Sequence, residues 1–367
     1  MYVKHQDSTT FIYNGKPIEE TEAYKYVGTV FTNKRKRFHD DHDLKSEKAL
    51  KAIFVSKKSV HDAVGNSLPV NLYLKIFDTQ IRPILDYGCE IWSRGENIHK
   101  LEIVHTDFLK RILGVKRQTP NIAVYGDTGR FPLAIKQMEL VVKYWLRLLS
   151  LPRESPLYNA YKELKHLDSK GYNTWCKNIR QILADHGRDQ LWVNQDSITE
   201  NRMANDVYRD LVNSFYDKYR IKWVNEVRDI STNPKLRTYQ AFKECHGKEV
   251  YLSAVQDKVH LRYLAQFRVS SHRLEIEVGR YTQTPVSERL CNFCQQGSVD
   301  DELHLLTQCS YHSAERNILY HCARTHIPNF SELSDPDIFK IIMKTDSTAV
   351  IVSLGKFLHQ CFKKRGI

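Results

Sequence analysis

The sequence predicts a mainly α-helical protein with a small β element at its N-terminal end and a small metal-binding module near its C-terminal end. Apolar residues recur at spacings of three and four over much of the 367 residues, which is typical of amphipathic helices. Aromatic and β-branched residues concentrate in the first thirty residues, which is typical of strands. Three cysteines and one histidine lie close together between residues 291 and 309.

The β element is predicted from two short segments. Phe11-Ile12-Tyr13 leads into Asn14-Gly15, a pair that suits a tight hairpin turn because both residues tolerate a positive φ. The segment 24–31 is rich in tyrosine, valine and phenylalanine and is predicted to form one further strand. We therefore expect β structure to end near Thr32.

The remainder of the chain is predicted to be helical. Apolar stripes with helical spacing cover residues 70–81, 101–112, 138–149 and 207–215. Proline and glycine suggest further boundaries near residues 129–132 and near Pro285. The predicted regions are a β element at 1–32, helical regions at 33–130 and 131–285, a zinc module at 286–325 and a helical tail at 326–367.

The metal-binding module is predicted from the spacing Cys291-x2-Cys294-x9-His304-x4-Cys309. Zinc prefers four sulfur or nitrogen ligands in a tetrahedron, and a Cys-x2-Cys turn supplies two of them from one short loop. Gly297 suits such a loop, and residues 300–302 (Asp-Asp-Glu) suit the start of a helix ahead of His304. We expect structural Zn²⁺ here, although cysteines can also be buried as small apolar side chains.

Two neighbouring residues leave the ligand set open. His312 and Cys322 lie close enough in sequence to replace one of the four predicted ligands.

The charge of the chain indicates a polyanionic partner. Lysine and arginine number 55 against 43 aspartates and glutamates, which gives a net charge of +12. The run Lys34-Arg35-Lys36-Arg37 suits phosphate contact, but also a solvated loop or a nuclear localisation signal. A basic track would continue across the helices if their faces align, through Lys57, Lys58, Lys110, Arg111, Lys116 and Arg117.

Other classes of protein are disfavoured. The first residues are too polar for a secretory signal, no apolar run reaches membrane-spanning length, and eight cysteines without a signal indicate reduced thiols in the nucleus or cytoplasm. Glycine-rich phosphate loops, nucleophile elbows and His-Glu-x-x-His helices are absent from the sequence. Asp40 and Asp41 suit the first turn of a helix better than two-metal catalysis. The tryptophans are expected to anchor cores.

Several longer segments resemble one family. Residues 11–19 and 24–32, then 81–92, 108–115, 124–133, 267–272 and 275–280, resemble the region that follows the catalytic palm in non-LTR (LINE-type, jockey- or CR1-like) retrotransposon reverse transcriptases. The resemblance implies the edge of a palm, a helical thumb that grips a template–primer duplex, a helical connector and a zinc knuckle. It also implies that Tyr26 and Gly28 lie in a nucleic-acid-binding strand, and that the partners are RNA, an RNA–DNA hybrid or duplex DNA.

The resemblance implies that this chain is not itself an enzyme. The family's catalytic carboxylates lie in an aromatic-x-Asp-Asp hairpin before the Tyr26 strand, where this chain is expected to lack them, so Mg²⁺ would bind only in an intact parent polymerase. Two alternatives stay open: the tail of an intact RNA-directed DNA polymerase, and a host-recruited helical interaction protein. The oligomeric state is open as well.

Overall fold

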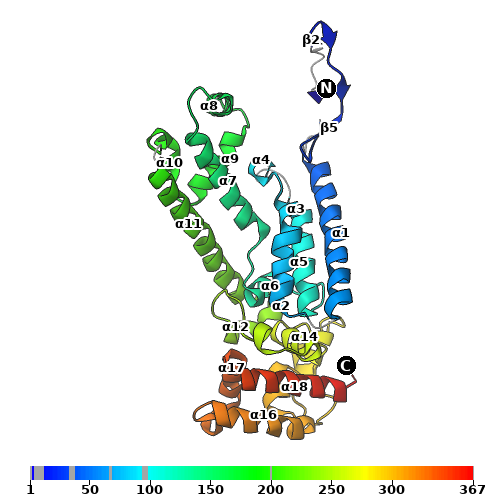
Figure 1. Ribbon diagram of the computed structural model, residues 1–367. Helices are drawn as coiled ribbons and strands as arrows, with labels where there is room; N and C mark the ends of the chain where they lie inside the picture. The colour runs from blue at the N-terminus through cyan, green and yellow to red at the C-terminus, as the bar shows by residue number, and fades with distance from the viewer. Residues whose placement is uncertain are drawn as a thin grey trace. The chain divides into compact units, whose positions relative to one another are not determined.

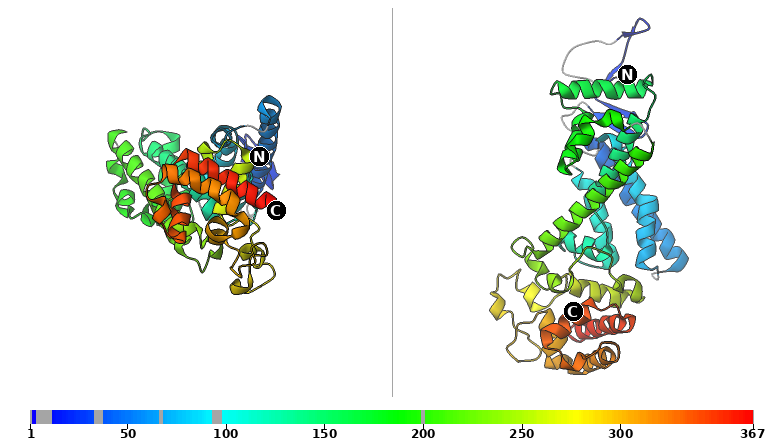
Figure 2. Two further views of the ribbon diagram at one scale, coloured as in Figure 1. Left: turned by 90° about the horizontal axis from the view of Figure 1, so that it is seen from below. Right: turned by 90° about the vertical axis from the view of Figure 1, so that its left-hand side faces the viewer.

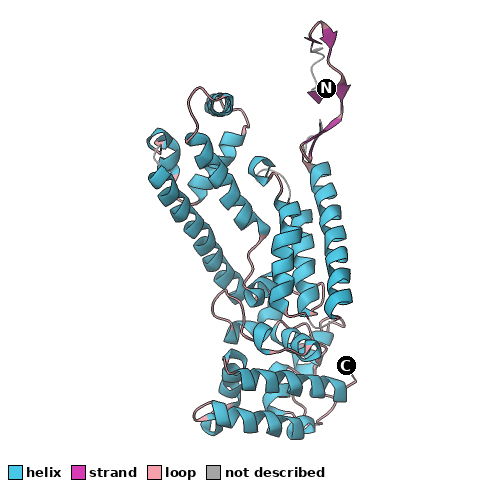
Figure 3. Ribbon diagram, in the orientation of Figure 1, coloured by secondary structure: helices cyan, strands magenta, loops and turns pink. Residues whose placement is uncertain are grey.

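The computed structural model describes residues 2–3, 12–32, 38–65, 68–92, 98–198 and 201–366, and helices make up most of them (Figure 3). The mainly α fold is therefore confirmed. The basic run Lys34-Arg35-Lys36-Arg37 lies outside the described residues.

Figure 1 labels many of the elements. The strands are β1 (Tyr2–Val3), β2 (Ile12–Tyr13), β3 (Lys16–Pro17), β4 (Glu20–Thr21), β5 (Ala23–Tyr26) and β6 (Thr29–Thr32). The α-helices are α1 (His39–Val64), α2 (Val70–Ile76), α3 (Arg82–Asp86), α4 (Cys89–Trp92), α5 (His99–Leu113), α6 (Asn121–Thr128), α7 (Leu133–Leu149), α8 (Pro156–Ser169), α9 (Trp175–Asp185), α10 (Asp189–Val193), α11 (Asn201–Arg228), α12 (Tyr239–Phe242), α13 (Tyr251–Ala254), α14 (Lys258–Arg268), α15 (Glu275–Val278), α16 (Ser313–His326), α17 (Asp335–Lys344) and α18 (Thr348–Lys364). The 3₁₀ and π turns are η1 (Phe77–Ile81), η2 (Gln195–Ser197), η3 (Pro234–Leu236), η4 (Val286–Glu288), η5 (His304–Gln308), η6 (Ser310–His312) and η7 (Phe330–Glu332).

The described strands form three separate two-stranded pairings. Strands β1 and β4 pair in parallel, whereas β2–β3 and β5–β6 are antiparallel. Asn14 and Gly15 connect β2 to β3 with φ values of 48° and 74°. These left-handed conformations confirm the predicted Asn-Gly hairpin turn.

The prediction of one continuous strand over residues 24–31 is wrong. The chain reverses at Val27 and Gly28, whose φ values are 42° and 87°, so that Tyr24 pairs with Phe31 across a second hairpin. Glycine adopts this conformation without steric cost, and the Tyr87 hydroxyl donates a hydrogen bond to the Val27 carbonyl. The residue types on either side favour strands, as predicted, and Gly28 forms the turn that separates them.

The four segments with helical periodicity are confirmed as helical. Residues 70–81 form α2 and the π turn η1, and the other three lie within α5, α7 and α11. Asp40 and Asp41 lie in the first turn of α1, as predicted. Asp41 is buried, pairs with Lys45 and accepts a 3.0 Å hydrogen bond from the backbone N–H of Val30, so it attaches β6 to α1.

The chain divides into two compact units. The first unit comprises residues 1–57, 76–105 and 131–219. Within it, α7 packs against α4, α8 and α9. Trp145 of α7 is fully buried and donates from Nε1 to the Tyr161 hydroxyl at 3.1 Å. Trp92 is buried in the same unit, which agrees with the predicted role of the tryptophans as core anchors.

The second unit comprises residues 58–75, 106–130 and 220–367. Helix α18 packs against α13, α14 and α16, and α16 and α18 run side by side in Figures 1 and 2. Gly355 permits close contact of α18 with α14, because a Cβ at this position would lie 3.2 Å from the Cβ of His260. The predicted C-terminal tail therefore supplies a core helix of this unit.

A buried ionic network joins several helices of the second unit. Asp127 at the end of α6 accepts hydrogen bonds from the hydroxyls of Tyr239 (2.9 Å) and Tyr251 (3.0 Å), and from Nε of Arg268 (3.0 Å). Arg268 also pairs with Glu249 at 2.7 Å. The neighbouring Gly126 has no room for a side chain, because a Cβ would lie 2.4 Å from the Trp223 ring.

Candidate metal centre

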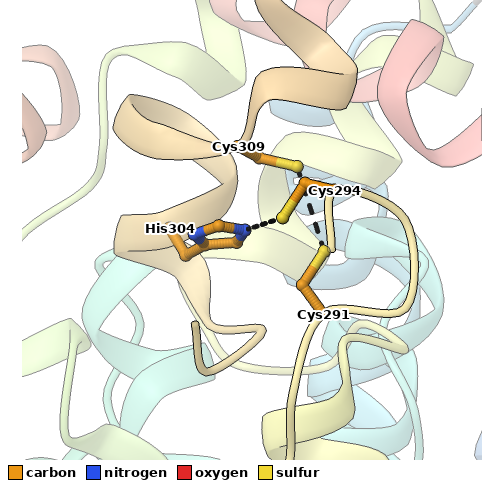
Figure 4. A group of neighbouring side chains, drawn as sticks. All are labelled: Cys291, Cys294, His304 and Cys309. Atoms are coloured by element: carbon orange, nitrogen blue, oxygen red, sulfur yellow. Dashed lines mark hydrogen bonds between the residues drawn. The ribbon is translucent and has the colours of Figure 1, made fainter. Parts of the chain in front are cut away.

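The structure brings the four predicted ligands together in the second unit (Figure 4). The ligand atoms of Cys291, Cys294, His304 and Cys309 all lie within 4.8 Å of one another. The Sγ atoms of Cys291 and Cys309 are 3.9 Å apart, and Cys294 Sγ lies 3.3 Å from His304 Nε2. In a tetrahedral zinc site with Zn–S bonds of about 2.3 Å, two sulfurs are about 3.8 Å apart. The four residues can therefore hold a metal ion such as zinc.

A tight loop positions the first two ligands. Leu290 and Val299 form an antiparallel bridge, and the backbone N–H of Cys291 donates to the Ser298 carbonyl at 2.9 Å. The chain reverses between them through Gln295 and Gly297, which have φ values of 55° and 66°. This reversal returns the chain from Cys294 to the bridge beside Cys291, and it gives Gly297 the role in the loop that its sequence position predicted.

A π turn positions the other two ligands. The Asp301 side chain accepts a 2.8 Å hydrogen bond from the backbone N–H of His304, so it caps the turn as predicted. The N–H of Cys309 then donates to the carbonyl of His304 at 2.8 Å, which is the i→i+5 pattern of a π-helix. Residues five apart on an α-helix differ by about 140° in direction at 3.6 residues per turn. The wider π turn instead places His304 and Cys309 on one side.

Arg365, the residue after α18, lies against the sulfurs of the cluster. Its fully buried guanidinium donates from Nη1 to both oxygens of Asp300 at 2.8 and 2.9 Å. Its Nη2 lies 3.7 Å from the sulfur of Cys291 and 3.9 Å from that of Cys309. Three thiolates and one Zn²⁺ would carry a net charge of −1, and the guanidinium, which also pairs with Asp300, would lie beside that charge. Sequence analysis missed Arg365, because 56 residues separate it from Cys309 and no local spacing connects them.

The two alternative ligands lie outside the cluster. His312 Nε2 accepts a 2.9 Å hydrogen bond from Nε of Arg365. Burial and, after it, the neighbouring Arg365 cation lower the pKa of His312 to about 4, so this imidazole is neutral at pH 7. Cys322 lies on α16 beside His326, with 4.0 Å between Sγ and Nδ1. The group that can hold a metal comprises the four residues predicted from spacing.

Protonation of the cluster opposes metal binding at low pH. In the metal-free protein, burial raises the pKa of the Cys291 thiol to about 12. Burial lowers the pKa of His304, against the opposing effect of Asp300 and Asp301. The imidazole is thus ready to coordinate at neutral pH, whereas a thiol must release its proton. Metal affinity therefore rises with pH.

A buried carboxylate connects the metal loop to the segment 267–272. Glu302 accepts hydrogen bonds from His272 Nε2 (2.8 Å), Ser270 Oγ (2.9 Å) and Arg237 Nη2 (2.8 Å). Burial alone would raise the pKa of the Glu302 carboxyl, but His272 and Arg237 hold it well below its usual range. Glu302 is therefore an ionised acceptor that fixes the metal loop to its support.

The residues predicted to contact nucleic acid lie in different surroundings. Tyr26 and Gly28 are exposed in the β5–β6 hairpin, and Lys57 and Lys58 are exposed on α1. The structure does not test their contact with nucleic acid, which stays a prediction.

The four basic residues around the end of α5 are of two kinds. Arg111 and Arg117 are exposed. Lys110 is buried and donates from Nζ to the Arg117 carbonyl at 2.8 Å, while Lys116 is half-buried and donates to the His272 carbonyl at 3.0 Å. The two lysines thus have structural partners in addition to their predicted role.

Comparison with known proteins adds no family assignment. No protein-family model, no curated protein and no solved structure matches this chain. None of the described helices combines the length and the apolar character needed to cross a lipid bilayer.

Proposed function

We propose that this chain is a non-catalytic nucleic-acid-binding region, stabilised by structural zinc, of the kind that follows the palm in non-LTR retrotransposon reverse transcriptases. The observation that carries the proposal is the convergence of Cys291, Cys294, His304 and Cys309 within 4.8 Å. Small zinc modules of this ligand type are a common means of binding RNA. The net charge of +12 and the family-like segments support the same function.

The zinc would act on stability rather than on chemistry. All four ligand positions are supplied by the protein, as in structural zinc sites, whereas catalytic sites keep one position for water or substrate. A bound structural zinc contributes on the order of 10 kcal/mol to the folding of a small module. Binding of nucleic acid would then come from basic side chains held on this stable framework.

The proposal that the chain is non-catalytic has support at Asp40 and Asp41. The Asp41 carboxylate is buried and already engaged by Lys45 and by the Val30 N–H. It cannot also hold magnesium without losing these contacts, so this pair does not suit two-metal phosphoryl transfer. Purified protein is therefore expected to bind a primer–template without extending it.

Elemental analysis tests the metal site. We expect one zinc per chain, and loss of zinc in Cys291→Ser, because a serine hydroxyl is a poor substitute for a thiolate ligand. Cys245→Ser is the matched control, since Cys245 is an exposed cysteine outside the cluster. A folded wild-type protein without zinc, or a Cys291→Ser variant that retains it, would contradict the assignment.

Titration with nucleic acid tests the binding function. A labelled RNA–DNA hybrid, a duplex DNA and a single-stranded RNA should each be titrated at two salt concentrations. We expect the logarithm of the association constant for the duplex to fall by about 0.9 per phosphate contact for each log unit of salt. Absence of binding at low salt, or binding that salt does not weaken, would refute the proposal.

A further inference from the structure

Three segments far apart in the sequence meet in the second unit beside the metal loop. They are residues 110–119 at the end of α5, the turn η3 with Arg237, and residues 271–280 around α15. The backbone N–H of Lys116 donates to Ser271 Oγ at 2.8 Å, and Lys116 Nζ donates to the His272 carbonyl at 3.0 Å. Arg237 Nη1 donates to Glu277 Oε1 at 2.5 Å. These hydrogen bonds fix the three segments to one another.

The junction gathers cations, which we call the basic cluster: Lys110, Lys116, Lys235, Arg273 and Arg280. Burial lowers the pKa of Lys116, and the nearby Lys235 and Arg273 lower it further. Burial likewise lowers the pKa of Lys235, with Arg280 acting in the same direction and Glu277 opposing both. Burial also lowers the pKa of Lys110, with Asp107 opposing this shift and Arg117 and Lys235 adding to it. Geometry also places these cations at one junction: Lys116 binds the carbonyl of His272, the residue before Arg273. Arg237, two residues after Lys235, binds Glu277, and Glu277 lies 3.9 Å from Arg280.

Few acidic groups compensate the basic cluster. Glu277 is the carboxylate that attracts both Lys116 and Lys235, but it already accepts from Arg237 at 2.5 Å and lies 3.9 Å from Arg280. Within the part of the chain that the structure describes, neither Lys235 nor Arg273 has an ion-pair partner. Arg273 is exposed and Lys235 is half-buried. The site thus holds two cations without an ion pair, and both are accessible to an anion in solution.

We propose that the basic cluster is a binding site for the phosphodiester backbone of a nucleic acid. This inference rests on the proposed function and names the surface that carries it. A phosphate chain can contact several cations of the cluster at once and releases condensed counterions when it does so. His272 also connects the cluster to the metal loop. Its carbonyl accepts a hydrogen bond from Lys116 of the cluster, and its Nε2 donates to Glu302 of the metal loop.

A charge-neutralising double variant tests the site. Lys235→Gln with Arg273→Gln removes the two cations that lack an ion pair and leaves the hydrogen bonds of Lys116 intact. The matched control is Arg324→Gln with Lys340→Gln, which neutralises one exposed arginine on α16 and one exposed lysine on α17. Both double variants lower the net charge by two. Each zinc-loaded protein is titrated with a labelled RNA–DNA hybrid over a series of salt concentrations.

The expected result is a difference in slope. If Lys235 and Arg273 each contact a phosphate, the slope of log association constant against log salt should become shallower by about 1.8 in the cluster variant. The control should keep the wild-type slope. Zinc content and circular dichroism verify the fold of each protein. If the double variant does not fold, the single variant of the exposed Arg273 decides the question, with an expected change of about 0.9.

The other outcomes separate this inference from the proposed function. Salt-sensitive binding by the wild type with equal slopes in cluster variant and control would overturn the assignment of the surface and leave the proposed function standing. Failure of the wild type to bind would overturn both. Polyglutamate is added as a competitor. If it displaces the hybrid at equal charge concentration, and the cluster variant abolishes that competition, the site recognises acidic peptide and the assignment to phosphodiester is wrong.

Discussion

Arg365 contacts the candidate metal centre without belonging to the four residues that could hold the metal. Its guanidinium contacts Asp300, His312 and the sulfurs of Cys291 and Cys309 from a fully buried position. Groups around a zinc site orient the ligands and adjust the charge that they carry. A cation beside these two sulfurs favours the deprotonated thiolates and therefore favours metal binding.

Replacement of Arg365 should weaken zinc binding. In Arg365→Met the thiolates lose their neighbouring cation and Asp300 loses its partner, so we expect zinc affinity to fall by about 10- to 100-fold. Competition with a chromophoric chelator measures this affinity. Arg324→Met, an exposed arginine on α16, is the control and should bind zinc like the wild type. Equal affinity in the folded Arg365→Met protein would show that the guanidinium has no influence on the metal.

At the scale of elements, the second unit depends on polar contacts between helices as well as on its apolar core. Asp127 of α6 meets Arg268 of α14, and the same carboxylate receives the hydroxyls of Tyr239 from α12 and Tyr251 from α13. Asp127 and Arg268 are almost completely buried. Each of the two buried charges would lose a charged partner if the other were removed, so the network stabilises the packing of these helices.

Removal of one partner should be more harmful than removal of both. Asp127→Ala leaves the buried Arg268 with Glu249 as its carboxylate partner and with the Met343 carbonyl, and we expect a loss of about 3–5 kcal/mol in the free energy of unfolding. Asp127→Leu combined with Arg268→Leu should recover part of this loss, because no unpaired charge remains. Urea unfolding of the zinc-loaded proteins gives both values.

The exposed ion pair between Glu244 and Lys344 supplies the control for this comparison. Glu244→Ala should change the stability of the same unit little, because solvent screens an exposed pair. A loss in Asp127→Ala no larger than that in Glu244→Ala would mean that the buried network does not stabilise the unit.

At the scale of the whole molecule, the basic residues differ in how far solvent reaches them. Many basic residues are exposed and solvated, whereas the basic cluster holds several cations in partly buried positions. Glu302 and His272 connect this cluster to the metal loop. Metal binding and nucleic-acid binding are therefore expected to be coupled.

Removal of zinc should weaken the binding of nucleic acid. Loss of the metal would release Glu302 from its fixed position and loosen His272, whose carbonyl binds Lys116. The slope of log association constant against log salt for the RNA–DNA hybrid should therefore become shallower by about one to two. The titration is performed before chelation, after chelation and after zinc is restored. Cys245→Ser should respond like the wild type throughout. Unchanged affinity and slope in zinc-free protein would show that the two sites act independently.

The sequence by itself determined the local features of this protein. Helical periodicity identified the main helices, Asn14-Gly15 identified one hairpin, and the spacing of Cys291, Cys294, His304 and Cys309 identified the four residues that the structure brings together. These features depend on residues within a few positions of one another, or on a ligand spacing that a short loop and one turn can close. The second hairpin was also local, but Gly28 was read as part of a strand.

Only the tertiary structure decided the surroundings of those features. Arg365 reaches the cysteines across more than fifty residues, Lys116 meets His272 across 156, and Asp127 meets Arg268 across 141. No spacing along the chain encodes such pairs, because the packing of helices brings them together and the order of packing depends on the whole core. The four residues that can hold a metal were therefore predictable from sequence, whereas the charges that surround and support them were not.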